Sequence, residues 1–349
     1  MGLLLFIFIL LCLYKLKIQS FNTEYISKPM TTRINGIFVF LVFLSHFSYY
    51  IPLNTSLDAP FKTFHGLLGQ LIVVSFLFYS GYGIMESIKK KGTPYVNTIL
   101  SNRFLRLLIM FDIAILLFLL TDYFLGYTFD LKTILLSFIG YESVMNSNWY
   151  IFVILILYLL TFISFKVTKN HYYLSAIIQT ILCIIFIKIM IDIGKPHHWV
   201  NTCLVYSWGI WYSLFNKKII AFINSHKLSY YIIFLISAIC FILTWKLRSN
   251  LWMHSLGSIF FMSMIILLSM KFNSSNPMLL WLGQHVFSIY ILQRIPMMIG
   301  HHWGLDHYPY IYFFISFVAT IIIALIYERI SNTAINKILR KKKANNNSH

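Results

Sequence analysis

The chain has 349 residues, of which 59% are hydrophobic and only 11% are charged, and its mean hydropathy is +0.75. A soluble domain of this length cannot cover its surface with so few charged side chains, so the composition excludes that class. Long apolar runs recur along the whole chain and predict an all-α, polytopic bundle of transmembrane helices.

Eleven apolar runs are predicted to be membrane-spanning helices. In chain order they cover residues 2–19, 33–52, 67–86, 104–126, 149–168, 172–193, 200–216, 229–246, 253–271, 279–299 and 308–328. The apolar segment 131–140 is too short to cross and is predicted to be interfacial or re-entrant. The first run lacks the basic start and the cleavage site of a signal peptide, so we predict that it is retained as a helix.

The basic residues are divided unevenly between the two sides of the predicted membrane. With eleven helices, 21 of the 28 Lys and Arg residues fall on one side and 7 on the other. The positive-inside rule then places the N-terminus outside and the C-terminus in the cytoplasm of a multi-pass protein of the bacterial plasma membrane. The net charge of +18 is therefore explained by orientation in the membrane, and no nucleic-acid partner is expected.

This reading divides the chain into three parts. Residues 1–28 form an N-terminal helix and a basic cytoplasmic linker, residues 29–331 form the membrane domain, and residues 332–349 form a basic, polar cytoplasmic tail. Membrane lipid is an expected partner of the tail, because clustered lysines are attracted to anionic headgroups. The cysteines and the histidine doublets show no metal-ligand spacing, so no metal site is predicted.

One titratable side chain lies at depth in the second predicted span. In TTRINGIFVFLVFLSHFSYY, thirteen positions separate Arg33 from His46, which is about 20 Å along a helix axis. An imidazole at that depth is costly unless it faces a polar cavity, and neutral histidine is well suited to accept a proton near pH 7. The position of His46 alone does not distinguish a catalytic role from a purely structural hydrogen bond to a neighbouring helix.

Two arginines open the fourth predicted span, in SNRFLRLLIM. Arg103 and Arg106 are three positions apart and share one helical face, so both can reach one anionic group. The planar guanidinium suits the phosphates of a cofactor arriving from the cytoplasm, whereas simple interfacial anchoring is the alternative. Further along, Asp112 lies inside the same span, and Trp149 and Tyr150 are explained equally well by an interfacial aromatic belt or a substrate platform.

The order of these segments resembles the acyltransferase-3 family of integral-membrane O-acyltransferases. INGIFVFLVFLSHFS is similar to that family's first core helix, and FLFYSGYGIMESIKKKG to the following one, with Ser80 and Gly81 near its centre. SNRFLRLLI resembles the arginine pair of the next helix, and NWYIFVILILYLL the Trp-Tyr helix. WLGQHVFSIYILQ resembles the late helix that carries Gly283, Ser288 and Tyr290. The resemblance spans roughly residues 30 to 330.

The resemblance implies a core of ten helices, preceded here by the extra helix 2–19. It also implies that acetyl-CoA is the acyl donor, that His46 is the catalytic histidine, and that Arg103 and Arg106 bind the donor.

The sequence departs from the family pattern at two places. An arginine usually precedes the glycine of the first core helix, but here Asn35 holds that position. Arg33, two residues earlier and on a different helical face, is the remaining candidate for donor binding there. The late helix commonly ends in histidine, where this chain has Gln293 followed by Arg294.

Together with the resemblance, these observations predict a membrane O-acyltransferase that acylates a hydroxyl of an extracytoplasmic or lipid-linked cell-surface glycan. The resemblance implies that the transferred group is acetyl and that acetyl-CoA is the donor. His46 is the predicted general base, and an acyl-histidine relay is an alternative. The remaining candidates for contacts with substrate or cavity are Ser80, Asp112, Trp149, Tyr150 and Tyr290. The competing prediction is a glycan or glycolipid transporter or flippase, for which broken Gly/Pro helices in matching halves would be typical.

Overall fold

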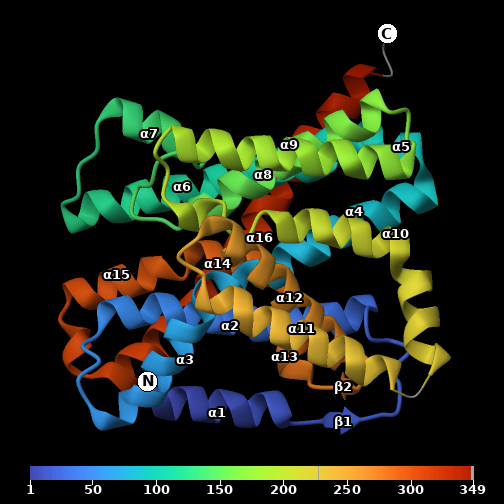
Figure 1. The fold of residues 1–349 in the computed structure, drawn as a ribbon. Coiled ribbons are helices and arrows are strands. Elements are labelled where there is room, and N and C mark those ends of the chain that lie inside the picture. Colours follow the sequence, from blue (N-terminus) through green and yellow to red (C-terminus); the bar gives the residue numbers. More distant parts are fainter. Residues whose placement is uncertain (227, 347–349) are drawn as a thin grey trace.

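The structure, a computed structural model, describes residues 1–226 and 228–346. Most of the long helices run side by side across the molecule (Figure 1). The elements are α1 (Gly2–Leu13), β1 (Leu16–Ile18), α2 (Lys28–Phe47), α3 (Ala59–Leu68), α4 (Val74–Lys91), α5 (Thr93–Ile99), α6 (Arg106–Leu125), α7 (Leu131–Ser137), α8 (Trp149–Val167), α9 (Tyr172–Asp192), α10 (Leu204–Ser225), α11 (Ser229–Lys246), α12 (Leu251–Ser269), β2 (Phe272–Ser274), α13 (Pro277–Gln284), α14 (Val286–Leu292), α15 (Arg294–His302) and α16 (Pro309–Asn346).

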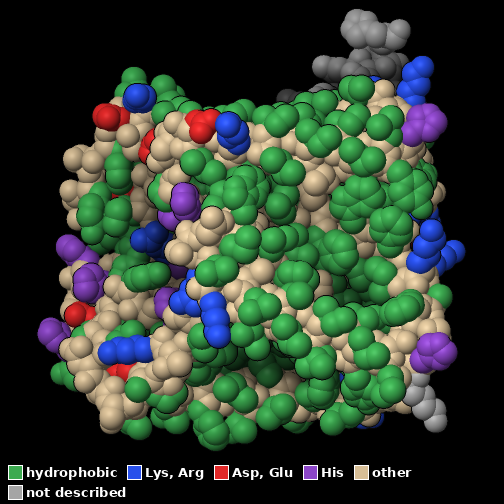
Figure 2. All heavy atoms as spheres, viewed as in Figure 1, with side chains coloured by type: hydrophobic (Ala, Val, Ile, Leu, Met, Phe, Trp, Pro, Cys, Tyr) green, Lys and Arg blue, Asp and Glu red, His purple; other side chains and the backbone are tan. Residues whose placement is uncertain are grey.

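The predicted class, a helical bundle with several membrane spans, is confirmed. Within the described residues, eight helical segments are long and apolar enough to cross a membrane. Hydrophobic side chains cover most of the face shown in Figure 2, as expected for a surface in contact with lipid. The predicted count of eleven is not established, because α1 has only 12 residues, α10 falls outside the eight, and the span 279–299 is divided.

The first helix is shorter than predicted. The expected span 2–19 ends at Leu13, so α1 is about 18 Å long, well short of a hydrocarbon core of about 30 Å. Its extension is replaced by β1, in which Leu16 pairs with Ser274 of β2 in an antiparallel ladder. α1 contacts α3, and it touches α2 through the rings of Phe8 and Phe40, which stack with centroids 4.3 Å apart.

Two further segments were singled out in the sequence, the short apolar segment 131–140 and the basic tail. Segment 131–140, predicted to be too short to cross, contains the seven-residue helix α7. The tail 332–349 is helical as far as the structure describes it, because α16 continues to Asn346; residues 347–349 lie outside the described residues.

Two helix pairs approach each other closely at glycines. A Cβ atom on Gly36 of α2 would lie 2.0 Å from the carbonyl oxygen of Leu279, and one on Gly283 of α13 would lie 1.8 Å from that of Thr32. No side chain larger than hydrogen fits at either position. These glycines therefore fix α13 against α2 and set the depth of the late helices relative to His46.

The second pair is α4 and α10. A Cβ atom on Gly81 would lie 2.1 Å from the carbonyl oxygen of Tyr206, and one on Gly209 would lie 2.3 Å from that of Phe78. Gly81 belongs to the Ser-Gly pair recognised in the sequence, so its close approach explains why Ser80 is held at a fixed place beside α8 and α10.

The late helix predicted at 279–299 is broken into α13, α14 and α15. At His285 the backbone leaves helical geometry, and the ring donates to or accepts from Glu328 of α16 at 2.7 Å. Ser288 also donates to the Glu328 carboxylate. Near Gln293, Pro296 removes one helical hydrogen bond and its ring crowds the carbonyl of Leu292, which ends α14.

The buried hydrophobic side chains form two clusters. One gathers around α2, α6 and α13–α16, and the other around α4 and α8–α12. Tyr79, Trp149 and Tyr150 pack against both clusters. The junction between the clusters is therefore lined by aromatic side chains, and both cavities described next open along it.

Candidate active site

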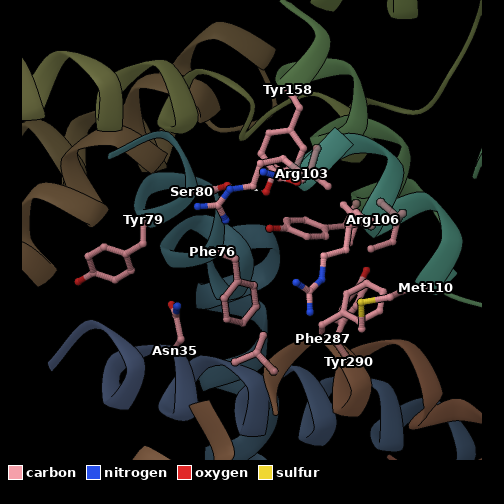
Figure 3. A pocket seen from close by; sticks show the side chains of 16 residues that line it. Asn35, Phe76, Tyr79, Ser80, Arg103, Arg106, Met110, Tyr158, Phe287 and Tyr290 are labelled. Carbon is pink, nitrogen blue, oxygen red and sulfur yellow. Dashed lines mark hydrogen bonds between the residues drawn. The ribbon is translucent and has the colours of Figure 1, made fainter. Parts of the chain in front are cut away.

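The first cavity, which we call the arginine cavity, has a volume of about 380 Å³ and is shown in Figure 3. It lies where α2, α4, α6, α8 and α14 converge, and both Arg103 and Arg106 project into it. Arg103 belongs to a π-helical turn, Leu100–Leu105, that precedes α6. Such a turn shifts the register of the side chains, and the two guanidinium groups enter the same space.

The two arginines keep donors free for a ligand. Nε of Arg103 donates to the hydroxyl of Tyr95 at 3.3 Å, and one terminal nitrogen of Arg106 donates to Asn332 at 3.1 Å. Neither arginine forms an ion pair within the described part of the chain. Their other N–H groups can therefore bind the oxygens of a phosphate, which prefers a charged and bidentate partner.

The rest of the arginine cavity is mainly aromatic and aliphatic. Tyr158 of α8 bonds to Ser80 of α4 at 2.8 Å, and the ring of Phe76 meets that of Tyr150 edge to face. Asn35 of α2 is also on the lining, and its side-chain oxygen is buried without a partner among the described residues. This lining suits a flexible, largely apolar chain that carries few polar groups.

The second cavity, which we call the histidine cavity, has a volume of about 520 Å³. His46 is half-buried on its wall, near the end of α2. Three further basic side chains share the lining, namely His65, His198 and Arg294. Ser143, Asn146, Ser147 and Asn148, from the loop before α8, add hydrogen-bonding groups.

The imidazole of His46 is oriented by Gln293. The amide nitrogen of Gln293 lies 3.0 Å from Nδ1 of His46 and 3.0 Å from the carbonyl oxygen of Tyr290. Because a carbonyl oxygen only accepts, the atom facing Tyr290 must be the nitrogen, and its second hydrogen is then directed at Nδ1. The neutral ring therefore carries its own proton on Nε2, and Nδ1 holds the basic lone pair.

Other hydrogen bonds fix the surroundings of His46. Ser45, the preceding residue, bonds to Nε2 of His65 at 2.8 Å. Nε of Arg294 donates to the hydroxyl of Tyr50 at 3.1 Å. His198 stands against the Trp149 ring, and partial burial lowers the pKa of its imidazole below its usual range. Arg294 is therefore the permanently charged member of the lining.

Tyr290 belongs to the lining of both cavities. Its ring lies 6.3 Å from that of His46, between ring centroids, and 5.5 Å from that of Tyr150. The neighbouring residues of α8 divide in the same way, since Trp149 lines the histidine cavity and Tyr150 lines the arginine cavity. An aromatic partition thus separates the space with the two arginines from the space with the histidine.

The structure brings most of the predicted site residues together, each on one cavity or the other. The arginine cavity holds Ser80, Arg103, Arg106, Tyr150 and Tyr290, and the histidine cavity holds His46, Trp149 and Tyr290.

Two predicted site residues are placed elsewhere. Arg33 and Asp112 are not on the lining of either cavity. Each has one buried side-chain atom without a hydrogen-bond partner among the described residues, Nε in Arg33 and Oδ1 in Asp112. Arg33 points away because it is two positions from Asn35 on a helix, which turns it by about 200°.

Several lining residues were not predicted as site residues. Gln293 and Arg294 stood out only as a departure from a motif, and His65 carried no signal at all, since it lies in an ordinary outer connection. Asn35 likewise appeared only as a missing arginine. The departures from the family motifs could have identified these residues. A different residue at a motif position still lies at the same place in the fold, and so it still lines the site.

One of the comparisons with known proteins identifies the family of the chain. The family model described as an acyltransferase domain, Acyl_transf_3, matches residues 34–329 and so covers most of the chain. No curated protein and no solved structure gives a significant match. The matched range begins in α2 and ends in α16, which encloses every residue that lines the two cavities. The chain belongs to the acyltransferase-3 family and is a multi-pass membrane acyltransferase.

Proposed function

We propose that the protein transfers an acetyl group from cytoplasmic acetyl-CoA to a hydroxyl of an extracytoplasmic or lipid-linked cell-surface glycan. The observation that carries this proposal is the pair of cavities that meet at Tyr290. One holds two arginines that form no ion pair with the described residues, and the other holds His46. A donor rich in phosphate needs positively charged groups, and an acceptor rich in hydroxyls needs hydrogen-bonding groups, so the two substrates suit the two different linings.

The arginine cavity would hold the donor. Arg103 and Arg106 would bind its phosphates, and the aromatic walls formed by Phe76, Tyr150 and Tyr158 would surround its long thioester arm. The size of the cavity, about 380 Å³, is in the range of small-molecule sites. The thioester then reaches the partition at Tyr290, and the acceptor approaches from the other cavity.

His46 would act as the general base. In the resting arrangement Gln293 covers its Nδ1 lone pair, so the acceptor hydroxyl must replace the Gln293 amide there. Nδ1 takes the hydroxyl proton, and the acceptor oxygen forms its bond to the thioester carbonyl carbon. As the carbon–sulfur bond breaks, the departing thiolate receives the proton from His46, which returns the ring to its neutral state.

The direction of transfer follows from the distribution of basic residues. With the eleven predicted helices, the 21 to 7 division of Lys and Arg favours a cytoplasmic location for the end of α4 and the beginning of α6. The arginine pair would then lie at the side where acetyl-CoA is made available. The His46 end of α2 then belongs to the outer half of the membrane. A bacterial plasma membrane, with glycan assembled on its outer face, fits this arrangement.

Sealed inside-out membrane vesicles test the proposal, because their cytoplasmic face is accessible to added acetyl-CoA. With a labelled acetyl group, we expect label in a glycan fraction from vesicles with the wild-type protein and almost none with the His46→Ala variant. Equal labelling by both would remove His46 from the mechanism. Movement of glycan across the membrane without label would instead support the transporter or flippase.

A further inference from the structure

The histidine cavity is lined by basic groups without an acidic one. Among the described residues, its titratable side chains are His46, His65, His198, Arg294 and Tyr49 together with Tyr290, and no Asp or Glu is on the lining. Of these groups only the guanidinium of Arg294 is charged at every physiological pH. The cavity therefore presents a fixed positive charge next to the residue that orients the catalytic ring.

The charge of Arg294 is not balanced by an ion pair. Its Nε is used by Tyr50, whose ring lies 6.0 Å from the guanidinium carbon, and no ion pair involving Arg294 forms within the described part of the chain. Asp122 of α6 interacts with Arg294 electrostatically. However, it does not line the cavity, and both of its carboxylate oxygens are buried without a hydrogen bond to the described residues.

A half-buried guanidinium that forms no ion pair with the described residues is costly to hold in a membrane domain, and the cost falls when an anion binds. The bond from Nε to Tyr50 leaves the two terminal nitrogens for a ligand. These nitrogens form the planar edge that matches the two oxygens of a carboxylate or phosphate.

We propose that the acceptor is acidic, with a carboxylate or phosphate that binds Arg294 while a neighbouring hydroxyl reaches His46. This inference rests on the proposed function, because it specifies the substrate of the same site. Arg294 directly follows Gln293, and Gln293 contacts Nδ1 of His46, so the bound anion and the reacting hydroxyl belong to one sugar unit or to two adjacent ones. Arg294 is then a determinant of acceptor specificity.

The test measures acceptor binding without an acyl donor. Purified full-length protein in lipid nanodiscs is titrated by calorimetry with three oligosaccharides of the same linkage. They differ only at C6 of each unit, which is a hydroxymethyl group in the first, a carboxylate in the second and a phosphorylated hydroxymethyl group in the third. We expect at least one of the two acidic sugars to bind ten times or more as tightly as the neutral one. The acidic sugar that binds more tightly identifies a uronic-acid or a phosphorylated acceptor.

Three variants assign the preference to its residue. Arg294→Gln should abolish the preference for the acidic sugar, and Arg294→Lys, which keeps the charge but loses the planar fork, should retain part of it. Arg248→Gln is the matched control, because Arg248 is exposed beyond the end of α11 and stacks on Trp245. Unchanged affinity of the Arg294→Gln variant for acetyl-CoA would show that the protein is still folded.

The inference is overturned if the wild-type protein binds the neutral sugar as tightly as the acidic ones. It is also overturned if neither acidic sugar binds at millimolar concentration, or if Arg294→Gln keeps the preference. These outcomes are separate from failure of the proposed function. A preference for the acidic sugar that depends on Arg294, in a protein that transfers no label to glycan, would sustain the anion site and reject the acyl transfer.

Discussion

The arginine cavity and the histidine cavity share Tyr290 but differ in the chemistry of their walls. The arginine cavity combines two guanidinium groups with a lining that is mostly aromatic and aliphatic. The histidine cavity surrounds His46 with serine, asparagine and basic side chains. A sugar loses many hydrogen bonds to water when it is bound and needs polar replacements, whereas a thioester arm needs few. Under the proposed function, this difference assigns the donor to the arginine cavity and the acceptor to the histidine cavity.

The largest effect is expected from His46→Ala. Removing the base from the histidine cavity should lower kcat for acetyl transfer by about 10²- to 10⁴-fold, the range attributed to general acid–base catalysis. The apparent KM for acetyl-CoA should change little, because the donor is held in the other cavity. Steady-state assays with labelled donor check this, and His302→Ala, at an exposed position of α15, is the control. Residual activity above a tenth of wild type would contradict the role.

The partition is tested by Tyr290→Ala. Loss of the ring joins the two cavities and admits water to the donor, so we expect hydrolysis of acetyl-CoA without acetylated glycan, together with transfer reduced by roughly 100-fold. Tyr290→Phe keeps the ring and should retain most of the transfer. Release of free CoA is compared with label in glycan for each variant. An unchanged ratio of the two products in Tyr290→Ala would show that the ring does not separate the cavities.

Binding of the donor is tested by replacing both Arg103 and Arg106 with Gln. Each charge-assisted hydrogen bond contributes about 1.5–3 kcal/mol, so we expect the KM for acetyl-CoA to rise by about 10- to 100-fold or more, with a smaller change in kcat. The KM for the glycan should stay the same. Lys90→Gln, at an exposed position of α4, serves as the control for loss of basic charge. A rise in the glycan KM alone would assign the arginines to the acceptor.

The spacing of the helices is tested by Gly283→Ala. The new Cβ atom would collide with the backbone of Thr32, so α13 must move away from α2, at a cost of about 1–3 kcal/mol in stability. Gly83→Ala, on α4, is the matched control because a Cβ atom there meets nothing within 4 Å. Thermal unfolding of the purified proteins in the same detergent compares them. Equal midpoints for the two variants would reject the close approach.

The smallest effect is expected from Gln293→Leu. The variant loses the bond that orients the His46 ring but also frees Nδ1, and these effects oppose each other. We expect kcat to change by less than about tenfold and the KM for acetyl-CoA to remain constant, since Gln293 does not line the arginine cavity. The same transfer assay measures both. A loss as large as that of His46→Ala would mean that Gln293 takes part in the reaction itself.

Much of the site was predictable because its residues are unusual for their surroundings. His46 is a titratable group in a run of hydrocarbon, and Arg103 and Arg106 repeat at helical spacing where a helix enters the membrane. Glycines in two recognised motifs, Gly81 and Gly283, lie where helices touch. These signals need only the local sequence, since an unusual charge in an apolar run, or a glycine in a motif, is visible before any packing partner is known.

Other features depended on residues far apart in the chain. The bond between His46 and Gln293 joins positions 247 residues apart. Arg294 could be recognised as a site residue only from the folded structure, in which it bonds to Tyr50 and lines the histidine cavity. The short α1 was not predicted for the same reason, because the predicted first span includes Leu16 and Ile18, whereas these residues belong to a strand that pairs with β2. Local hydropathy cannot distinguish a helix from a strand that finds a pairing partner.

The sequence by itself determined that the protein is a bundle of membrane helices, and it marked one histidine and two arginines as unusual for their apolar surroundings. These properties follow from the transfer of side chains between water and lipid, which adds up residue by residue. Only the tertiary structure decided that the arginine pair and His46 lie on separate cavities and that Tyr290 stands between these two. A cavity is the space left when particular helices pack, and that packing is set by contacts between distant backbones, such as Gly36 with Leu279.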